Sequence, residues 1–351
     1  PKRRFCQEAR YSLGRVTPTL DPRPHIPYIP TRLVQPIILN AGSPEVARPM
    51  RYYALISNDG DNRLTAEPED GLLLDLTSID PDLTDLEDLA IAASLSGTNI
   101  DEIASRILSD GEADRFDLGE LMDMSRGGES YYRLDRPFEP PEVWAAGVTY
   151  KSSELERIRE SDTPDVYSNV YSAERPELFF KATPDRCVGP FESVGIRGDS
   201  DWNVPEPELA FVLYKDEIIG YTIGNDMSSR TIEGQNPLYL PQAKVFDRCC
   251  AIGPCFVSAE SLGDVTDLSI ACTITRNGED VWHDETSTSE MARSCDELAD
   301  WLQRYNYVPN MTAVLTGTAI VPPPEFTLRE EDIVTMSISG IGTLENDVVV
   351  V

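Results

Sequence analysis

Two glutamates, Glu206 and Glu208, stand two positions apart in Glu-Pro-Glu-Leu-Ala, a run typical of a β-strand. Because residues i and i+2 of an extended strand project from the same face, the two carboxylates are expected to converge. Asp226 follows after a β-rich run, 211–223, that is long enough to form a hairpin partner. Three oxygen ligands without neighbouring Cys or His favour a hard cation, Mg²⁺ before Mn²⁺ or Ca²⁺. The alternative is a set of solvated acids in a very acidic protein.

Lys244, in Ala-Lys-Val-Phe-Asp, is the candidate for proton transfer or enolate stabilisation. The chain has 30 Lys and Arg residues, of which only five are Lys. Since Lys gives up its proton far more readily than Arg, each remaining Lys is a candidate for chemistry that Arg cannot do. A partly desolvated Lys near a metal can have a lowered pKa and act as a base. The alternative is a structural salt bridge to one of the metal carboxylates.

Composition excludes several classes of protein. With 351 residues we expect one large domain or two modest ones. The formal net charge of -31 argues against nucleic acid and anionic membranes as partners. No apolar stretch approaches the roughly 20 residues of a transmembrane helix. Two histidines, His25 and His283, disfavour a His-based zinc site and a Ser-His-Asp triad.

The charged and sulfur-containing residues also predict an environment. Many acids with very few lysines suit molar salt, where self-repulsion is screened and carboxylates keep a hydrated shell. We therefore predict a halophilic protein; an ordinary acidic mesophilic protein would explain the charge but not the missing lysines. The seven Cys show no metal-binding spacing, which fits a reducing, cytoplasmic location.

Residues 1–49 differ from the rest of the chain. They carry eight basic and three acidic residues, are rich in proline and lack a sustained apolar period. At Met50 the pattern changes to a β-strand followed by the turn 58–60. We predict that the native protein starts at Met50 and that 1–49 is a non-native or disordered extension; a functional disordered tail is the competing interpretation.

The remaining chain is predicted to be α+β. A small α+β domain spans 50–138, with strands at 52–56 and 72–76 and helices at 83–95 and 100–108, the second capped by Asn99. A proline-rich linker, 136–141, leads into a strand-rich catalytic domain, 139–351. Its predicted strands are 144–150, 208–214, 218–223, 255–257, 267–276, 313–318 and 333–338, with helices at 152–160 and 289–305. Asn277-Gly278 predicts a hairpin, and the architecture is expected to be mainly antiparallel.

From Trp144 onward the order of motifs resembles the fumarylacetoacetate hydrolase superfamily. Motifs similar to those of the family are Gly147-Val148-Thr149-Tyr150, Pro176-Glu177-Leu178-Phe179-Phe180-Lys181, Glu206-Pro207-Glu208-Leu209-Ala210, Gly224-Asn225-Asp226-Met227-Ser228-Ser229-Arg230, Lys244-Val245-Phe246-Asp247 with Gly253-Pro254, Leu315-Thr316-Gly317-Thr318, and Ile341-Gly342-Thr343-Leu344-Glu345-Asn346. The resemblance implies a mixed β-roll core, Mg²⁺ on Glu206, Glu208 and Asp226, and 2-oxo acid or 1,3-diketone substrates. It also implies dimers or tetramers.

One departure from the family narrows the expected reaction. Hydrolases of this family carry a lid His, paired with Glu, that activates water; here the corresponding position is Ser153, with Glu156 where the Glu should fall. His283 lies far away on a predicted hairpin. In lacking this base, and in its segment 320–328, the chain resembles the haloarchaeal branch of the family that dehydrates 2-keto-3-deoxy-pentonates. The expected reaction converts a 2-dehydro-3-deoxy-D-pentonate, of the arabinonate or xylonate type, to 2,5-dioxopentanoate and water in oxidative pentose degradation.

The remaining candidates surround the expected substrate. Glu156 would transfer a proton at C3 or C4, or be an ordinary exposed helix acid, and Ser153 would orient the leaving hydroxyl. Gly317 and Thr318 would hold the substrate carboxylate, or simply end a strand. Further substrate-binding candidates are Arg230, with a core ion pair as its alternative, and Lys181 and Tyr150.

Two other functions compete with this one. An acylpyruvate or fumarylacetoacetate-type hydrolase, or a 2-oxo acid decarboxylase, would use the same scaffold, and the missing lid His argues against it. A binding or structural protein that has lost activity is disfavoured by the intact carboxylates, Lys244 and Thr318. A surface Ca²⁺ module is excluded because the Glu pair lies in an apolar strand. The preferred pentonate epimer depends on the shape of the pocket rather than on any motif.

Overall fold

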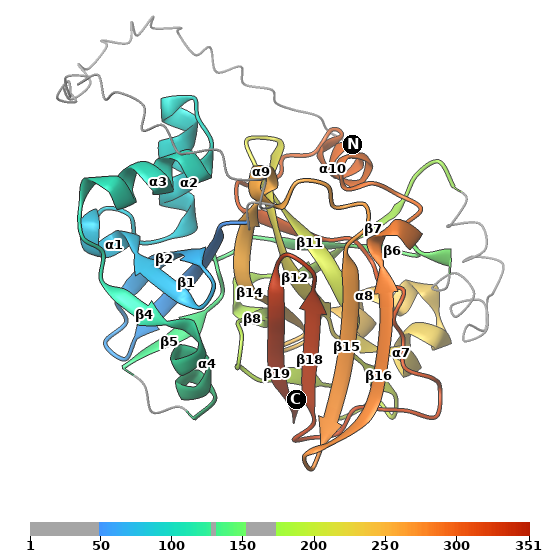
Figure 1. Ribbon diagram of the computed structural model, residues 1–351. Coiled ribbons are helices and arrows are strands. Elements are labelled where there is room, and N and C mark those ends of the chain that lie inside the picture. The colour runs from blue at the N-terminus through green and yellow to red at the C-terminus, as the bar shows by residue number, and fades with distance from the viewer. Residues whose placement is uncertain (1–48, 128–130, 152–172) are drawn as a thin grey trace, which may run out of the picture. The chain divides into compact units, whose positions relative to one another are not determined.

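The computed structural model describes residues 49–127, 131–151 and 173–351, and Figure 1 shows their helices and strands. Ser153, Glu156 and the predicted helix 152–160 lie outside these ranges, as do residues 1–48 of the predicted N-terminal extension. Within the described residues, no helix is both long enough and apolar enough to span a membrane.

A mixed sheet of twelve strands, counted within the described residues, contains the strands that position the site. Its order is β4 (Arg115–Asp117), β3 (Leu72–Asp75), β2 (Asn62–Glu69), β1 (Arg51–Ser57), β14 (Cys250–Ser258), β12 (Glu217–Asp226), β11 (Pro207–Tyr214), β17 (Thr312–Leu315), β6 (Val143–Gly147) and β7 (Glu177–Ala182). Two further strands join it, β5 (Tyr132–Asp135) on β1 and β8 (Cys187–Val188) on β14. Neighbours are antiparallel except β6–β17 and β8–β14, so the expected mainly antiparallel architecture is confirmed.

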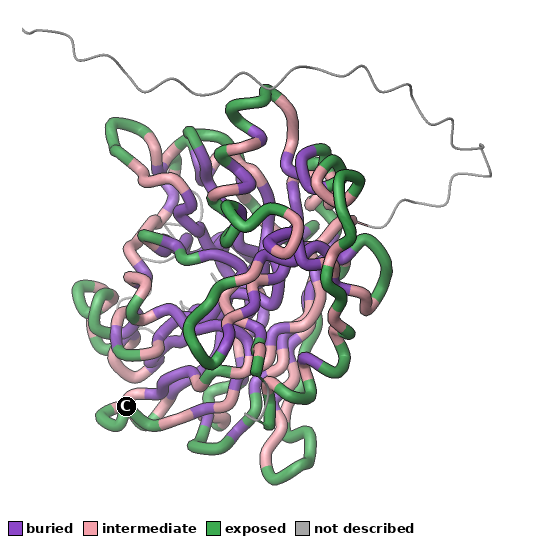
Figure 2. Tube along the Cα trace, turned by 90° about the vertical axis from the view of Figure 1, so that its left-hand side faces the viewer, coloured by how far each residue is buried: buried purple, intermediate pink, exposed green. Residues whose placement is uncertain are grey.

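A second sheet has the order β16 (Glu279–Ser287), β15 (Ser269–Arg276), β18 (Ile333–Ile338), β19 (Gly342–Val350) and β9 (Val194–Ile196). The strands β15 and β18 alternate buried and more exposed residues, as a sheet with one face in the core requires. Every residue of β11 and β14 is buried, because both faces of these strands are covered. The second sheet packs on this central part of the first through β19, β18 and β15, and Figure 2 shows the buried segments inside the exposed loops. A short ribbon pairs β10 (Asn203–Val204) with β13 (Ser228–Ser229).

The helices are short and mostly begin at a side-chain cap. They are α1 (Leu76–Ile79), α2 (Leu86–Ser96), α3 (Ile100–Asp110), α4 (Leu118–Gly127), α7 (Arg230–Gln235), α8 (Leu240–Lys244), α9 (Ala259–Leu262) and α10 (Cys295–Gln303), with 3-10 turns at Pro184–Arg186, Pro237–Tyr239 and Thr288–Glu290. The predicted cap of α3 is confirmed, because the Asn99 side chain accepts from the Glu102 N–H.

Two predicted helix starts were too early, and capping explains both. The helix predicted at 289–305 begins only at Cys295, because Ser294 accepts from the Glu297 N–H. The helix predicted at 83–95 begins at Leu86, because Asp85 caps it through the Asp88 N–H. Apolar periodicity continued past both caps and so placed the helix starts too early.

The predicted strand 333–338 is confirmed to the residue. The predictions 144–150 and 313–318 ended too late, since these strands end at Gly147 and Leu315, and 255–257 is only part of the strand Cys250–Ser258. Asn277 and Gly278 have φ of 54° and 81° and join β15 to β16, as a tight hairpin requires. The predicted division into domains 50–138 and 139–351 stays a prediction. The pairing of β1 with β14 joins strands from both segments in one sheet.

The hairpin of β11 and β12 carries the acidic residues, and its approach to β14 is unusually close at one residue. A β-carbon placed on Gly220 would clash with the carbonyl oxygen of Val257 and with the ring of Phe256. Because backbone cannot move aside as a flexible side chain can, β12 and β14 require glycine at this point.

Replacing Gly220 with Ala is therefore expected to lower the free energy of unfolding by about 1–3 kcal/mol, the usual cost of overpacking. Chemical denaturation followed by fluorescence measures this difference. The matched control is Gly127→Ala at the exposed end of α4, where a β-carbon would meet no atom within 4 Å and Ala is expected to leave stability unchanged or slightly raised. A Gly220→Ala protein as stable as the wild type would contradict the close strand approach.

Candidate metal centre and active site

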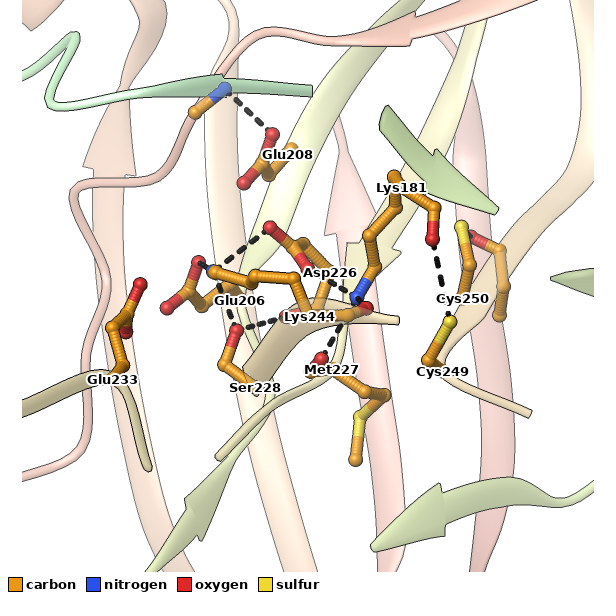
Figure 3. A network of polar contacts seen from close by, with 12 residues as sticks. Lys181, Glu206, Glu208, Asp226, Met227, Ser228, Glu233, Lys244, Cys249 and Cys250 are labelled. Atoms are coloured by element: carbon orange, nitrogen blue, oxygen red, sulfur yellow. Dashed lines mark hydrogen bonds and ion pairs between the residues drawn. The ribbon is translucent and has the colours of Figure 1, made fainter. Parts of the chain in front are cut away.

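Glu206, Glu208 and Asp226 converge as their spacing predicted. One carboxylate oxygen from each lies within 4.8 Å of the others, and the residues are 4%, 1% and 1% exposed. Glu206 precedes β11 and Glu208 lies within it, while Asp226 ends the neighbouring strand β12, where Pro207 pairs with Asn225. Figure 3 shows the three carboxylates facing one another. The hairpin register thus brings Asp226 next to the two glutamates that precede it in the sequence by 18 and 20 positions.

The carboxylates line a small cavity of about 10 Å³. Its walls come from β6 and the segment after it, from β7, from the acidic hairpin, from α7 and α8, and from the segment after β17. The lining residues are Ala146, Gly147, Val148, Phe179, Glu206, Glu208, Asp226, Arg230, Lys244, Gly317, Thr318 and Val321. Among the described residues, no histidine lines it. His283 lies on β16, and its side chain is 50% exposed.

Lys244, the last residue of α8, projects onto the acidic cluster. Its ammonium donates to Glu206 at 2.7 Å, to Asp226 Oδ2 at 2.9 Å and to the Ser228 hydroxyl at 2.6 Å. The ring of Phe179, on the cavity wall, lies 5.6 Å away. Lys244 therefore sits at hydrogen-bonding distance from two of the three candidate metal ligands. Ser228 and Phe179 were not singled out from the sequence, although both stand in the quoted motifs.

Lys181, on β7, reaches the same cluster from a different direction. Its ammonium lies 2.6 Å from Asp226 Oδ1, and the residue is fully buried. Burial is the largest effect and lowers the pKa of this lysine, but the charge of Asp226, together with smaller contributions from Cys249 and Cys250, leaves the pKa raised. Lys181 is not among the residues that line the cavity.

Arg230 opens α7 next to Glu206. Its guanidinium lies 3.5 Å from Glu206 and 3.2 Å from Glu233, and all three residues are buried. Glu233 was missed by the sequence analysis. The spacing i, i+3 on a helix that follows Asp226 was the signal available for it, since side chains so spaced lie on one face.

Gly317 and Thr318 close the cavity after β17. The Gly317 N–H donates to Glu208 at 2.6 Å, so in this structure it orients a candidate metal ligand. Gly317 has φ of 90°, and a β-carbon there would meet the hydroxyl of Thr149. The Thr318 hydroxyl contacts the backbone of Ile320. Tyr150 is fully buried, and burial, followed by the charge of Glu208, raises its pKa.

The electrostatics of the cluster favour an added positive charge. Burial, then the charges of Asp226 and Glu206, raise the pKa of Glu208 well above its ordinary value, against the opposing effects of Lys244 and the Gly317 N–H. Carboxylate oxygens are the ligands that hard divalent cations prefer. The residues therefore fit Mg²⁺, with Glu206, Glu208 and Asp226 as its protein ligands.

Comparisons with known proteins place this arrangement in a family. The profile of the family described as "Fumarylacetoacetate (FAA) hydrolase C-terminal" matches residues 142–349. A Haloferax volcanii protein named "Probable 2-keto-3-deoxyxylonate dehydratase" is 49% identical over 306 residues, which cover 86% of this chain and 100% of that protein. A Saccharolobus solfataricus 2-dehydro-3-deoxy-D-arabinonate dehydratase is 44% identical over 218 residues, covering 60% and 73% of the two chains.

Solved structures show the same relationship. The structure titled "2-keto-3-deoxy-D-arabinonate dehydratase complexed with magnesium and 2,5-dioxopentanoate" superposes with a TM-score of 0.72 and 34% identity, covering 86% of this chain and 99% of that one. The apo form gives the same values.

The raised pKa of Glu208 predicts a pH-dependent stability. When a carboxyl group has a higher pKa in the folded protein than in the unfolded protein, its protonation stabilises the fold as the pH falls through the folded-state pKa. At higher pH the charge of the group destabilises the fold. In metal-free protein, Glu208→Gln is therefore expected to raise the Tm at alkaline pH. The gain should shrink as the pH falls, each unit of pKa shift being worth about 1.4 kcal/mol.

Thermal melts in chelator across a pH series measure this difference. Glu279→Gln, on the exposed strand β16, is the matched control and should leave the Tm unchanged at each pH. A Glu208→Gln protein that is destabilised at alkaline pH would contradict the repulsion inferred for the cluster.

Proposed function

The chain belongs to the fumarylacetoacetate hydrolase C-terminal family, and on that premise we propose that it dehydrates a 2-dehydro-3-deoxy-D-pentonate, of the arabinonate or xylonate type, to 2,5-dioxopentanoate and water in a Mg²⁺-dependent reaction. The observation that carries this proposal is the buried carboxylate cluster with Lys244 on it, in a cavity whose described lining contains no histidine. The identity to dehydratases along the chain supports it.

Glu206, Glu208 and Asp226 would hold the cation, Mg²⁺ by preference with Mn²⁺ or Ca²⁺ as substitutes. When bound, the cation supplies positive charge beside the substrate's C2 carbonyl, which acidifies the C3 protons. The three side chains come from one hairpin; the Gly317 N–H orients Glu208, and Lys244 orients Glu206 and Asp226. Such outer hydrogen bonds restrict the orientations of ligating carboxylates.

The reaction moves protons and expels one hydroxyl. A base removes a proton from C3, the C4 hydroxyl takes up a proton and leaves as water, and a C3=C4 double bond forms. A proton shift from C5 to C3 moves this double bond to C4=C5, and the resulting enol takes up a proton at C4 as its O–H proton is lost, which gives the C5 aldehyde. Lys244 lines the cavity with its ammonium beside the carboxylates, so it is placed to stabilise negative charge on the C2 oxygen or to transfer a proton.

The substrate anion has two candidate partners in the cavity wall, Arg230 and Thr318. Arg230 is the larger donor, with five N–H groups in a planar fork that suits a carboxylate. Glu156 and Ser153 remain our candidates for the second proton transfer and for orienting the leaving hydroxyl. Both lie outside the described residues.

A C–C hydrolase or a decarboxylase on the same scaffold is the second candidate. Hydrolysis needs a base that activates water, and a lid His would serve. The chain has His only at positions 25 and 283, and His283 is on the exposed strand β16. The proposal of dehydration therefore stands ahead of hydrolysis.

The setting of the enzyme is also proposed. We infer a cytoplasmic homo-oligomer, dimer or tetramer, adapted to high salt, with a small N-terminal domain before a β-roll. The composition supports salt adaptation, since 61 acidic residues oppose 30 basic ones of which five are Lys.

The first experiment is a direct assay. The full chain in molar KCl with Mg²⁺ is expected to convert 2-dehydro-3-deoxy-xylonate or -arabinonate to 2,5-dioxopentanoate, followed with a coupled aldehyde dehydrogenase. Chelation should abolish the product, and added Mg²⁺ should restore it. Cleavage of an acylpyruvate with no dehydration would replace the proposal with the hydrolase.

Glu208→Gln tests the metal ligands. This variant is expected to lose at least about 100-fold in kcat/KM, because the charge stabilisation that the cation supplies is worth several kcal/mol. Initial rates at saturating Mg²⁺ measure the loss, and Glu279→Gln should retain wild-type rates. Full activity in Glu208→Gln would remove Glu208 from the ligand set.

A further inference from the structure

Lys181 is the one lysine of the described site that does not reach the cavity. It has no exposed surface, and its ammonium contacts the cluster through Asp226 (Figure 3). Lys244 lines the cavity, whereas Lys181 does not. A group in this position cannot touch a substrate bound there, so any effect it has on the reaction is transmitted through its partners.

The ammonium of Lys181 has three buried oxygen partners. It forms an ion pair with Asp226 Oδ1 at 2.6 Å, and it donates to the carbonyl oxygen of Met227 at 2.9 Å and to the carbonyl oxygen of Lys244. A lysine ammonium has three donors and no acceptor. Three oxygen atoms from three residues therefore surround this one nitrogen atom.

These acceptors belong to the parts of the site that must keep their relative positions. Asp226 is a candidate metal ligand, Met227 follows it at the end of β12, and the Lys244 carbonyl lies at the end of α8. The Lys181 nitrogen, from β7, thus connects the strand that carries Asp226 to the backbone of Lys244, the candidate catalytic lysine.

Resting on the function proposed above, we propose that Lys181 is a positioning residue, which fixes the Asp226 carboxylate and the backbone of Lys244 so that both face the cation site. It is assigned no substrate contact and no proton transfer.

The two lysines share Asp226 in a way that fits this assignment. Lys181 binds Oδ1 and Lys244 binds Oδ2, so both carboxylate oxygens are held and the plane of the carboxylate is defined. Each ammonium also lies 5.6 Å from a phenylalanine ring, Phe246 for Lys181 and Phe179 for Lys244. Lys181 holds the Asp226 carboxylate from the side away from the cavity, and Lys244, which lines the cavity, holds it from the other side.

The geometry also explains why lysine stands at this position in a chain with few lysines. Three acceptors surround one nitrogen atom, whereas arginine spreads its donors over a planar fork. Arginine would retain the charge but could not place three N–H groups at one point. We therefore expect Lys181→Arg to weaken Mg²⁺ binding, as Lys181→Met does.

Isothermal titration of the metal-stripped full chain with Mg²⁺ alone tests the proposal. Lys181→Met is expected to raise the Mg²⁺ Kd by about 10–100-fold, the usual effect of removing a group that orients a ligand. Lys181→Arg should raise it by about 10-fold. Lys215→Met removes an exposed lysine at the tip of the β11–β12 hairpin and should leave the Kd unchanged.

A wild-type Kd in Lys181→Met, even with a lowered Tm, would overturn the proposal, because a purely structural lysine would change stability alone. If Lys181→Met does not fold, Lys181→Arg decides: a raised Kd supports positioning, and a wild-type Kd overturns it. The metal titration is independent of the reaction. If the wild-type protein dehydrates no pentonate but the variants bind Mg²⁺ more weakly, the positioning role stands and the proposed function falls. If the wild-type protein is an active dehydratase but the variants bind Mg²⁺ with wild-type affinity, the proposed function stands and the positioning role falls.

Discussion

Three carboxylates that lie within 4.8 Å of one another in a buried site repel each other and have lost most of their hydration. Such a cluster persists only if the surrounding protein supplies opposing charge and hydrogen-bond donors. Here Lys244, Lys181 and Arg230 provide the charge, and the Gly317 N–H provides a donor. The site is thus a balanced set of buried ions, in which removing one member leaves another uncompensated.

The β11–β12 hairpin and its neighbouring elements hold these buried charges together. The acids lie on a hairpin whose strand β11 is buried throughout, flanked by β14 and β17, so solvent does not screen the charges from the sides. The cations come from other elements, Lys181 from β7, Lys244 from α8 and Arg230 from α7. Long-range packing, rather than any local segment, therefore sets the charge of the site.

That division explains what could be predicted from the sequence. The convergence of Glu206 and Glu208 follows from strand periodicity, and the hairpin register then adds Asp226. No local sequence pattern tells from which side a lysine contacts the carboxylates. Lys181 was a candidate for substrate binding, and the structure places it against Asp226 and outside the lining of the cavity. Glu233 was missed because its role depends on the guanidinium it contacts, and the Gly317 N–H donates to Glu208 because β17 pairs beside β11.

The charge of the site also bears on which molecules fit it. Among the described residues, four buried carboxylates (Glu206, Glu208, Asp226 and Glu233) face three buried cations, which leaves one formal negative charge. A divalent cation would turn this into one formal positive charge, which the single carboxylate of a pentonate neutralises. Because buried charges are costly unless they are compensated, a monoanionic 2-oxo acid completes the balance. A neutral diketone would leave it incomplete, so the charge of the site favours a substrate that carries a carboxylate.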